Sequence, residues 1–346
     1  MLLEGLFLPL VTPFYPDGRL NLRKIEHNVD RYSRTPAAGI VVLSATGEPE
    51  MLSDQETREA LSTAISLAAD SKVMIAGISR ASVAGTLELV DHAAAAGYDC
   101  VLVPRPAGLT GKPQETRTFF QSIADRSPLP VILYSTHSAG LSVDAVAELA
   151  SHPQIIGLVD EDATGSRVAQ LTTATATITR EVTVTTIFTP VTGRMLALKE
   201  SGGAATFVSA ETLGGGTAVA TAPPKPAIKT RSKKVGFQIM AASSTGMLEG
   251  LRAGAVGAMP TFAACAPQAS YEVYAAWKDG DQPLADEKQA RISPAIQVVE
   301  AELNLPGIRY ASELTGYFGG RPRLPLLPLS GEQRERVERV MQGIRN

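Results

Sequence analysis

The chain has 346 residues, of which 19% are charged, and its formal net charge is −3 at pH 7. That length suits one large barrel or two ordinary domains. No basic run and no positive excess favours a nucleic-acid partner or an anionic membrane surface. The apolar start, 1–14, lacks a basic flank and the length of a membrane span. We therefore expect a cytoplasmic protein that acts on small molecules or on other proteins.

Short apolar runs recur along the chain at intervals that suit alternating strands and helices. Their apolarity is continuous rather than alternating, which is typical of parallel strands that are buried on both faces. Eight such runs lie at 6–11, 40–43, 73–76, 100–103, 131–134, 155–159, 237–240 and 255–259. The pattern predicts an α/β fold, a (β/α)8 TIM barrel, in which active sites lie at the carboxyl ends of the strands.

Helical patterns fill the intervals between these runs. The stretch 53–69 begins at Ser53, which can form a capping box with Glu56, and the stretch 86–96 ends at Gly97, a typical helix stop. After the eighth run, the stretches 266–277, 287–303 and 331–344 also favour helices. We predict a C-terminal helical region over 266–346.

One interval, between the sixth and seventh runs, is too long for one helix and its turns. Its composition shifts to Thr, Val, Gly and Ala. Strands are favoured at 181–188, 205–211 and 217–221, a glycine turn at 214–216, and an exposed linker at 222–226 and 229–234. We predict a small β-rich insertion at 178–234, which leaves the barrel to 1–177 and 235–265.

The two cysteines, Cys100 and Cys265, each lie in or beside an apolar run. This placement favours buried thiols over a disulfide framework or a zinc site. The glycines at 214–216 lack the strand-to-helix context of a phosphate-binding loop. We expect neither a cofactor nor a metal.

Several segments, in the same order along the chain, resemble the dihydrodipicolinate synthase and N-acetylneuraminate lyase superfamily. The stretch 10–14 resembles the opening strand of that family, and 44–48, Ser-Ala-Thr-Gly-Glu, resembles its Gly-Thr-Thr-Gly-Glu loop, which grips the substrate carboxylate. The stretch 131–134 resembles the strand that ends in the catalytic tyrosine, and 253–257 resembles the approach to the eighth strand. The resemblance implies a barrel that binds a small oxo acid or carboxylate, and a homo-oligomer, either a dimer or a tetramer.

In that family a lysine amine condenses with the ketone of the substrate to form a Schiff base. The stretch 155–161, Ile-Ile-Gly-Leu-Val-Asp-Glu, resembles the strand that carries this lysine, and Val159 stands at its position. Valine has no nitrogen that could act as a nucleophile. The resemblance therefore predicts that the chain has kept the fold and lost class I aldolase chemistry.

Other residues of the expected pocket match the family only in part. Tyr134 matches the catalytic tyrosine and could relay a proton. Thr46 and Gly47 could still offer a hydroxyl and backbone N–H groups to a carboxylate, whereas Ala45 replaces a family threonine. Arg105 falls where the family has paired tyrosines and could provide a different anion contact.

The substrate-binding arginine that the family carries after strand five falls near Ala139 here. Lys199 lies in a segment whose sequence resembles that of the family's lysine strand. It could replace the missing amine if the insertion reached over the pocket. His137 could act as an acid or a base. His137 and the acids at 160–162 could also hold a metal, although acidic loops are usually only hydrated.

Three functions are therefore open. The favoured one is an oxo-acid-binding barrel without Schiff-base chemistry, which acts as a sensor, a regulatory homologue or an enzyme of changed mechanism. The second is an active lyase or aldolase that uses Lys199 or a metal. The third is a non-catalytic protein that binds a partner through the insertion at 178–234.

Overall fold

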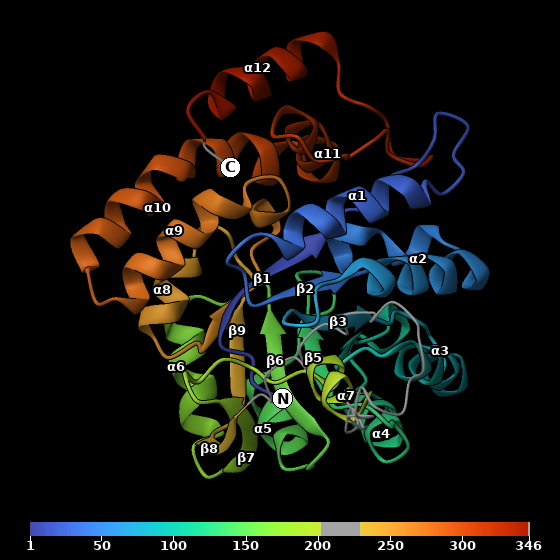
Figure 1. Cartoon of the computed structure of the whole chain (residues 1–346), viewed down its shortest axis with the longest axis vertical. Coiled ribbons are helices and arrows are strands. Elements are labelled where there is room, and N and C mark those ends of the chain that lie inside the picture. Colours follow the sequence, from blue (N-terminus) through green and yellow to red (C-terminus); the bar gives the residue numbers. More distant parts are fainter. Residues whose placement is uncertain (202–228, 345–346) are drawn as a thin grey trace, which may run out of the picture.

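The computed structural model describes residues 1–201 and 229–344, with side chains described up to residue 197 in the first stretch (Figure 1). Within these residues, eight parallel strands close a barrel in the order β1-β10-β9-β6-β5-β4-β3-β2. The barrel strands are β1 (Gly5–Leu10), β2 (Gly39–Val42), β3 (Val73–Gly77), β4 (Cys100–Pro104), β5 (Val131–Ser135), β6 (Ile155–Asp160), β9 (Gln238–Ala241) and β10 (Gly257–Ala258). The predicted TIM barrel is confirmed.

Helices connect the strands and cover the outside of the barrel. They are α1 (Leu22–Ser33), α2 (Asp54–Leu67), α3 (Val83–Ala96), α4 (Pro113–Ala124), α5 (Val143–Ala150), α6 (Gly165–Ala174) and α8 (Met247–Arg252). The capping box between Ser53 and Glu56 is present at the start of α2. Gly97 ends α3 with a φ of +96°, a left-handed conformation that glycine adopts without a steric cost.

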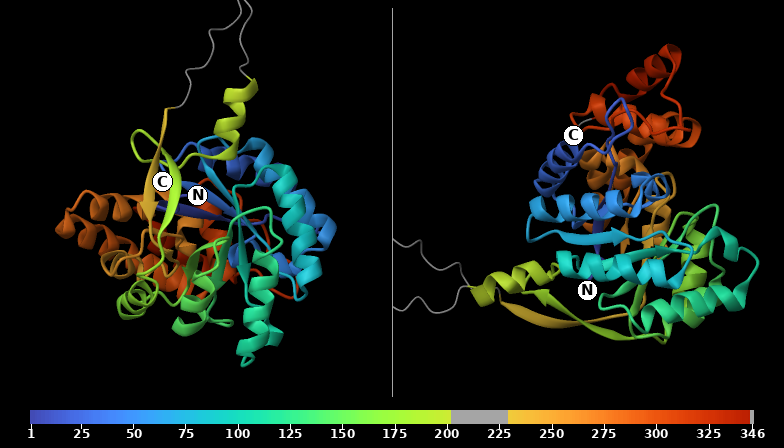
Figure 2. Two further views of the ribbon diagram at one scale, coloured as in Figure 1. Left: turned by 90° about the horizontal axis from the view of Figure 1, so that it is seen from below. Right: turned by 90° about the vertical axis from the view of Figure 1, so that its right-hand side faces the viewer.

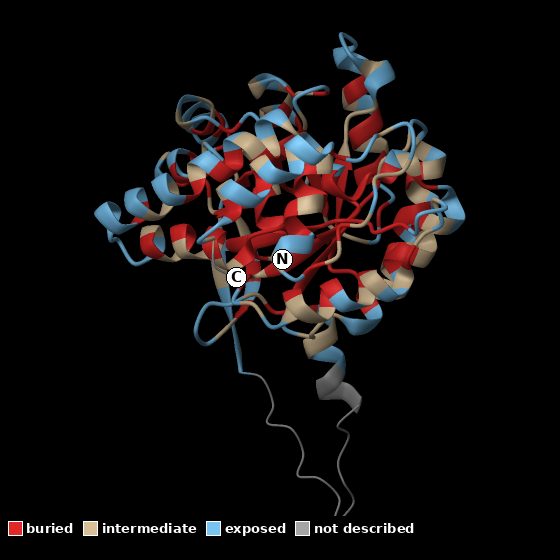
Figure 3. Ribbon diagram, turned by 90° about the horizontal axis from the view of Figure 1, so that it is seen from above, coloured by how far each residue is buried: buried red, intermediate tan, exposed pale blue. Residues whose placement is uncertain are grey.

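The core has two layers because successive strand residues point to opposite faces. One cluster fills the barrel interior and includes Phe7, Val41, Ile132 and Met240. A larger cluster lies between the strands and the surrounding helices. Figure 3 shows the buried strands at the centre and the exposed outer faces of the helices. Both cysteines are buried, as predicted.

After α6 the chain departs from the barrel pattern. β7 (Arg180–Thr185) pairs with β8 (Thr230–Val235) in an antiparallel sheet of two strands, and α7 (Gly193–Ser201) follows β7 (Figure 2). The N–H of Gly193 donates to Oδ1 of Asp99 at 3.0 Å, and Asp99 immediately precedes β4. The first residue of α7 therefore lies at the amino-terminal end of the barrel strands.

Two expectations for this segment need correction. The stretch 229–234 was expected to be an exposed linker, but all of it except residue 229 belongs to β8, which pairs with β7 along its full length. Its basic side chains remain largely exposed, while Val182 and Val184 of β7 are buried against Leu2. The strand expected at 181–188 ends at Thr185. The features expected at 205–211, 214–216, 217–221 and 222–226 lie outside the described residues.

The C-terminal helical region gathers on one side of the barrel (Figure 1). It contains α9 (Pro267–Lys278), α10 (Gln282–Ile296), the π-helical turn η6 (Gln297–Glu302), α11 (Asn304–Leu314) and α12 (Gly331–Met341). The helix expected at 287–303 is thus the second half of α10 followed by η6, and α11 was not predicted. Among the described residues, no helix combines the length and the apolarity that a membrane crossing requires.

Candidate active site

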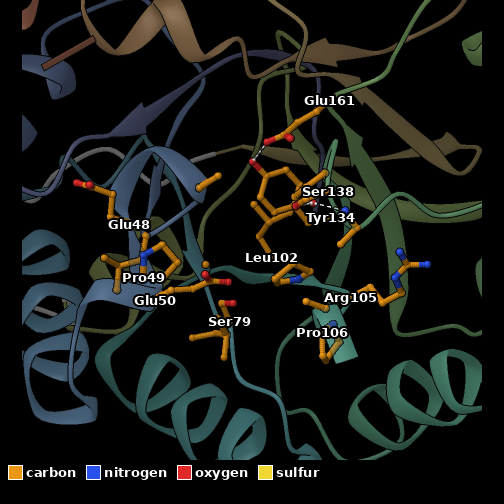
Figure 4. A pocket seen from close by; sticks show the side chains of 18 of the residues that line it. Glu48, Pro49, Glu50, Ser79, Leu102, Arg105, Pro106, Tyr134, Ser138 and Glu161 are labelled. Carbon is orange, nitrogen blue, oxygen red and sulfur yellow. Dashed lines mark hydrogen bonds between the residues drawn. The ribbon is translucent and has the colours of Figure 1, made fainter. Parts of the chain in front are cut away.

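A cavity of about 360 Å³ opens at the carboxyl ends of the strands β2 to β6 (Figure 4). A second cavity of about 510 Å³ lies beside it and reaches η6. Both cavities are lined by Ala45, His137, Glu161 and Leu305. We therefore treat them as one site with two lobes. The β4 lobe is the cavity lined by Arg105, and the η6 lobe is the cavity lined by Glu300.

Val159 lies inside the barrel beneath this site. It pairs in register with Tyr134 on one side and Met240 on the other, and it is 0% exposed. All three side chains belong to the interior cluster, and Val159 lines neither lobe. At the strand position where the family resemblance implies a lysine, this chain therefore has a valine side chain packed in the core.

Tyr134, near the end of β5, is joined to the loop after β6. Its hydroxyl donates to Oε1 of Glu161 at 2.5 Å, as Figure 4 shows. Oε2 of Glu161 accepts the backbone N–H of His137 at 2.9 Å. Burial raises the pKa of Tyr134 well above its usual value, and the charge of Glu161 raises it further. The phenol therefore stays protonated at neutral pH, and both oxygens of Glu161 are engaged.

The three consecutive acids after β6 point to different partners. The carboxylate of Asp160 is fully buried and pairs with Nε of Arg167 at 2.6 Å, while Glu161 faces Tyr134. Asp162 accepts a hydrogen bond from Nδ1 of His137, whose side chain is exposed at the rim. Within the described part of the chain, no cluster of three or more His, Cys, Asp or Glu side chains could hold a metal.

The loop after β2 forms one side of the site through a tight turn, η1 (Ala45–Gly47). Thr46 is buried and lines the η6 lobe. Leu43 adopts a left-handed φ of +61°, a conformation that costs free energy and is often found at functional sites. A Cβ atom at Gly77 would lie 2.1 Å from the carbonyl oxygen of Leu43, so only glycine fits there.

Arg105 follows β4 and offers a cation to the β4 lobe. Its Nη2 donates to Oγ1 of Thr110 at 3.4 Å. Its Nε is buried and has no hydrogen-bond partner among the described residues. An N–H group of this kind is stabilised when an acceptor reaches it, so Arg105 can contact an anion. Ala139, which stands near the family's arginine position, also lines this lobe.

Two site residues were missed by the sequence analysis because they lie on the C-terminal helical region. Glu300 of η6 lines the η6 lobe. Arg309 of α11 pairs with Glu48 of the β2 loop, and both side chains are almost completely buried. Arg309 and Glu48 are 261 positions apart in sequence, and Glu300 meets Glu161 from another distant segment. Pro294, inside α10, was the only local signal that the helix changes near Glu300.

Lys199 lies on α7, whose first turn is held against the amino-terminal ends of the barrel strands. Besides Gly193, Arg194 makes this contact, by donating to the carbonyl of Gly97 at 3.2 Å. The side chain of Lys199 lies outside the described residues. The structure thus brings Tyr134, His137, Thr46 and Arg105 to one site, and it anchors the helix of Lys199 at the other end of the barrel.

Comparisons with known proteins agree with this architecture. The family model of the dihydrodipicolinate synthetase family matches residues 2–197 and 225–344. A 4-hydroxy-tetrahydrodipicolinate synthase of Acidiphilium cryptum is 27% identical over 346 residues, which covers 99% of this chain and 98% of that protein. One from Xanthomonas campestris is 33% identical over 174 residues, which covers 49% of this chain and 58% of that protein.

Solved structures show the same fold. A dihydrodipicolinate synthase of Bacillus anthracis aligns with a TM-score of 0.77 and 20% identity over 100% of both chains. A prophage protein of the same family from Escherichia coli K12, solved in complex with pyruvate, aligns with a TM-score of 0.77 and 20% identity over 99% of both chains. Since the family model spans most of its length, this chain belongs to the dihydrodipicolinate synthetase family.

Proposed function

We propose that this chain binds a small oxo acid or carboxylate non-covalently in the two-lobed site. The observation that carries the proposal is the position of Val159, which packs inside the barrel next to Tyr134 and offers no amine. The Escherichia coli relative that was solved with pyruvate supports this class of ligand. Without an amine at Val159, the ligand would be held by hydrogen bonds and charge alone.

We infer from the charges that the carboxylate of such a ligand lies in the β4 lobe. Arg105 lines that lobe and has a buried N–H group. Glu161 lines both lobes, and the η6 lobe adds Glu300 without any arginine or lysine among its described lining residues. Two like charges about 4 Å apart repel by roughly 4 kcal/mol at the effective dielectric constant of a protein surface. That repulsion would exceed a typical hydrogen-bond gain of about 1 kcal/mol, so the favourable place for the ligand carboxylate is beside Arg105 and away from Glu161.

A substitute lysine is the main alternative, and the position of α7 argues against it. From Gly193 to Lys199 the helix rises by roughly 9 Å, at about 1.5 Å per residue. A strand as long as β6 spans roughly 20 Å. A helix that starts at the amino-terminal ends of the strands therefore cannot carry the backbone of Lys199 to their carboxyl ends.

The test is intact-protein mass spectrometry after incubation with pyruvate and sodium borohydride, which traps a Schiff base as a stable adduct. We expect no adduct, together with a rise in melting temperature when pyruvate is added. An adduct that disappears in Lys199→Ala would identify Lys199 as the nucleophile and refute non-covalent binding. No adduct and no stabilisation would refute oxo-acid binding as well.

The stabilisation by added pyruvate, measured at several pyruvate concentrations, can also test the contact between Arg105 and the ligand carboxylate. Arg105→Ala should weaken pyruvate binding by about tenfold to a hundredfold, because a hydrogen bond to a charged group contributes about 1.5–3 kcal/mol. Arg117→Ala is the matched control, since Arg117 pairs with Glu148 away from the site at 2.6 Å. Equal affinity in both variants would remove Arg105 from the site.

A further inference from the structure

Two glutamates from distant parts of the chain line the η6 lobe. Glu161 follows β6, and both of its oxygens accept hydrogen bonds, from Tyr134 and His137. Glu300 belongs to η6, and its Oε2 is buried without a hydrogen-bond partner among the described residues. Glu161 is therefore a fixed acceptor, whereas Glu300 keeps one carboxylate oxygen without a partner among the described residues.

The local backbone explains why Glu300 reaches the site. Pro294 lies inside α10 and has no N–H to donate, which disturbs the helix from within. The chain then continues as the π-helical turn η6, a wide turn that is frequent at functional sites. A Cβ atom at Gly307 would lie 2.1 Å from the carbonyl oxygen of Val299, so α11 packs directly against this turn. The turn that carries Glu300 is thus held from both sides.

The surroundings of Glu300 favour proton transfer near neutral pH. Burial raises the pKa of Glu300 to about 7, and the charge of Glu161 acts in the same direction. Hydrogen bonds from the Ser244 hydroxyl and the Phe262 N–H lower it, as does His137. A carboxyl group with a pKa near the working pH is present in both forms, which is the condition for efficient general acid–base catalysis.

We propose that Glu300 is the acid–base residue of this site and exchanges a proton at the carbon next to the carbonyl of a bound 2-oxo acid. This inference rests on the proposed oxo-acid binding. The Glu300 carboxylate takes the proton, the C–H electron pair forms a C=C bond, and the carbonyl π pair moves to oxygen as an enolate. Thr46, in the same lobe, supplies a hydroxyl to that oxygen. The proton then returns to carbon, so nothing is oxidised or reduced.

The experiment follows the methyl protons of pyruvate by ¹H NMR in D₂O, with the full chain. The wild type should exchange them for deuterium faster than buffer does. Glu300→Gln should lower the exchange rate by about 100-fold to 10,000-fold, the usual contribution of a general base. Its affinity for pyruvate, measured by calorimetry, should stay close to that of the wild type, because the ligand carboxylate lies in the other lobe.

The pH profile separates a chemical role from a structural one. The ionised form of Glu300 is the base, so the wild-type rate should rise as pH passes through about 7 and then level off. The titratable groups that face Glu300 are Glu161, His137, Tyr134 and Cys265. These groups remain in Glu300→Gln. If one of them caused the rise in rate near pH 7, the variant would still show that rise. We expect the rise to be absent from the variant.

Glu302→Gln is the matched control. Glu302 lies on the same turn, but its carboxylate pairs with Arg336 at the surface, so exchange and pH profile should remain those of the wild type. Glu300→Asp keeps the carboxyl group on a shorter side chain and should retain part of the rate. If Glu300→Gln fails to fold, Glu300→Asp is the deciding variant. An exchange rate in Glu300→Asp equal to that of the wild type would then overturn the proposal.

The outcomes distinguish this inference from the proposed function. Wild-type protein that binds pyruvate without catalysing exchange would overturn the role of Glu300 and leave the binding function intact. Undiminished exchange in Glu300→Gln, or exchange accompanied by a borohydride-trapped adduct, would also overturn it. No binding of pyruvate would refute the proposed function and this inference together.

Discussion

Arg309 and Glu48 form an ion pair in which the two side chains are 1% and 2% exposed. Arg309 also donates to the carbonyl of Thr12 at 2.9 Å, and burial lowers its pKa to about 9. Removing one member of a buried ion pair leaves the other charged and without a partner. At this residue scale, a single side chain of α11 therefore holds the loops after β1 and β2 in place.

Arg309→Ala should lower the free energy of unfolding by about 3–5 kcal/mol, the usual cost of breaking a buried ion pair from one side. Urea denaturation measures the change. Arg336→Ala is the control, because its pair with Glu302 is about 40% exposed at both ends, 41% and 39%, and should contribute at most about 1 kcal/mol. Equal losses in the two variants would contradict the importance of burial.

Residue-scale features of the site were only partly predictable. Tyr134, Thr46 and Arg105 could be named because each lies at or shortly beyond the end of an apolar strand in a segment that corresponds to a pocket position of the family, and strand ends meet at one face of a barrel. Glu300 and Arg309 could not, because the site residues that they face, Glu161 and Glu48, lie in distant parts of the sequence. Nothing in the local sequence around either residue indicates which face of the barrel its helix will cover.

At the scale of elements, the barrel strands were predictable because each is a continuous apolar run. β8 was not, since its sequence is basic and its partner strand is β7, with Thr185 pairing with Thr230. β8 forms because its backbone hydrogen-bonds with β7, and its amino-acid composition does not indicate a strand. α11 was missed for a related reason: its buried face includes Arg309 and Ser312, which weaken the apolar pattern.

The insertion proposed at 178–234 includes residues that the barrel uses. Nη2 of Arg180 donates to the carbonyls of Ala150, His152 and Ile155 at 2.7 to 2.9 Å. Beyond β7, the turn exposes Ile187 and Phe188, which are 78% and 49% exposed. The tip, Ile187 and Phe188, is therefore exposed, whereas Arg180 of β7 contacts the barrel.

This division predicts different effects for two deletions. Replacing 186–229 by Asn-Gly joins Thr185 to Thr230 through a two-residue turn that suits antiparallel strands. That variant should fold and bind pyruvate, but with a lower melting temperature, because it loses the hydrogen bonds of Gly193 and Arg194 to the barrel. Deleting 178–234 also removes the Arg180 hydrogen bonds and should lower the melting temperature further. Thermal melting that ranks the two deletions in the opposite order would contradict this boundary.

At the scale of the whole molecule, the C-terminal helical region is part of the site. Leu305 and Leu326 line the β4 lobe, and Glu300 lines the η6 lobe. Arg323 donates to the Glu56 carboxylate of α2 at 2.5 and 2.9 Å and to the carbonyl of Gly18 at 2.9 Å. A ligand in the site would therefore touch segments from both ends of the chain, and binding should stabilise them together.

Hydrogen–deuterium exchange with and without pyruvate tests this coupling. A ligand that binds only the native state slows the local openings that its contacts oppose. We expect slower exchange in η6, α11 and the loop 45–48, and unchanged exchange in β7, because β7 lies outside both lobes. Slowing that is confined to the loops after β2 to β6 would mean that the C-terminal region only covers the barrel. Slowing in η6 as well would place Glu300 beside the ligand, as its proposed acid–base role requires.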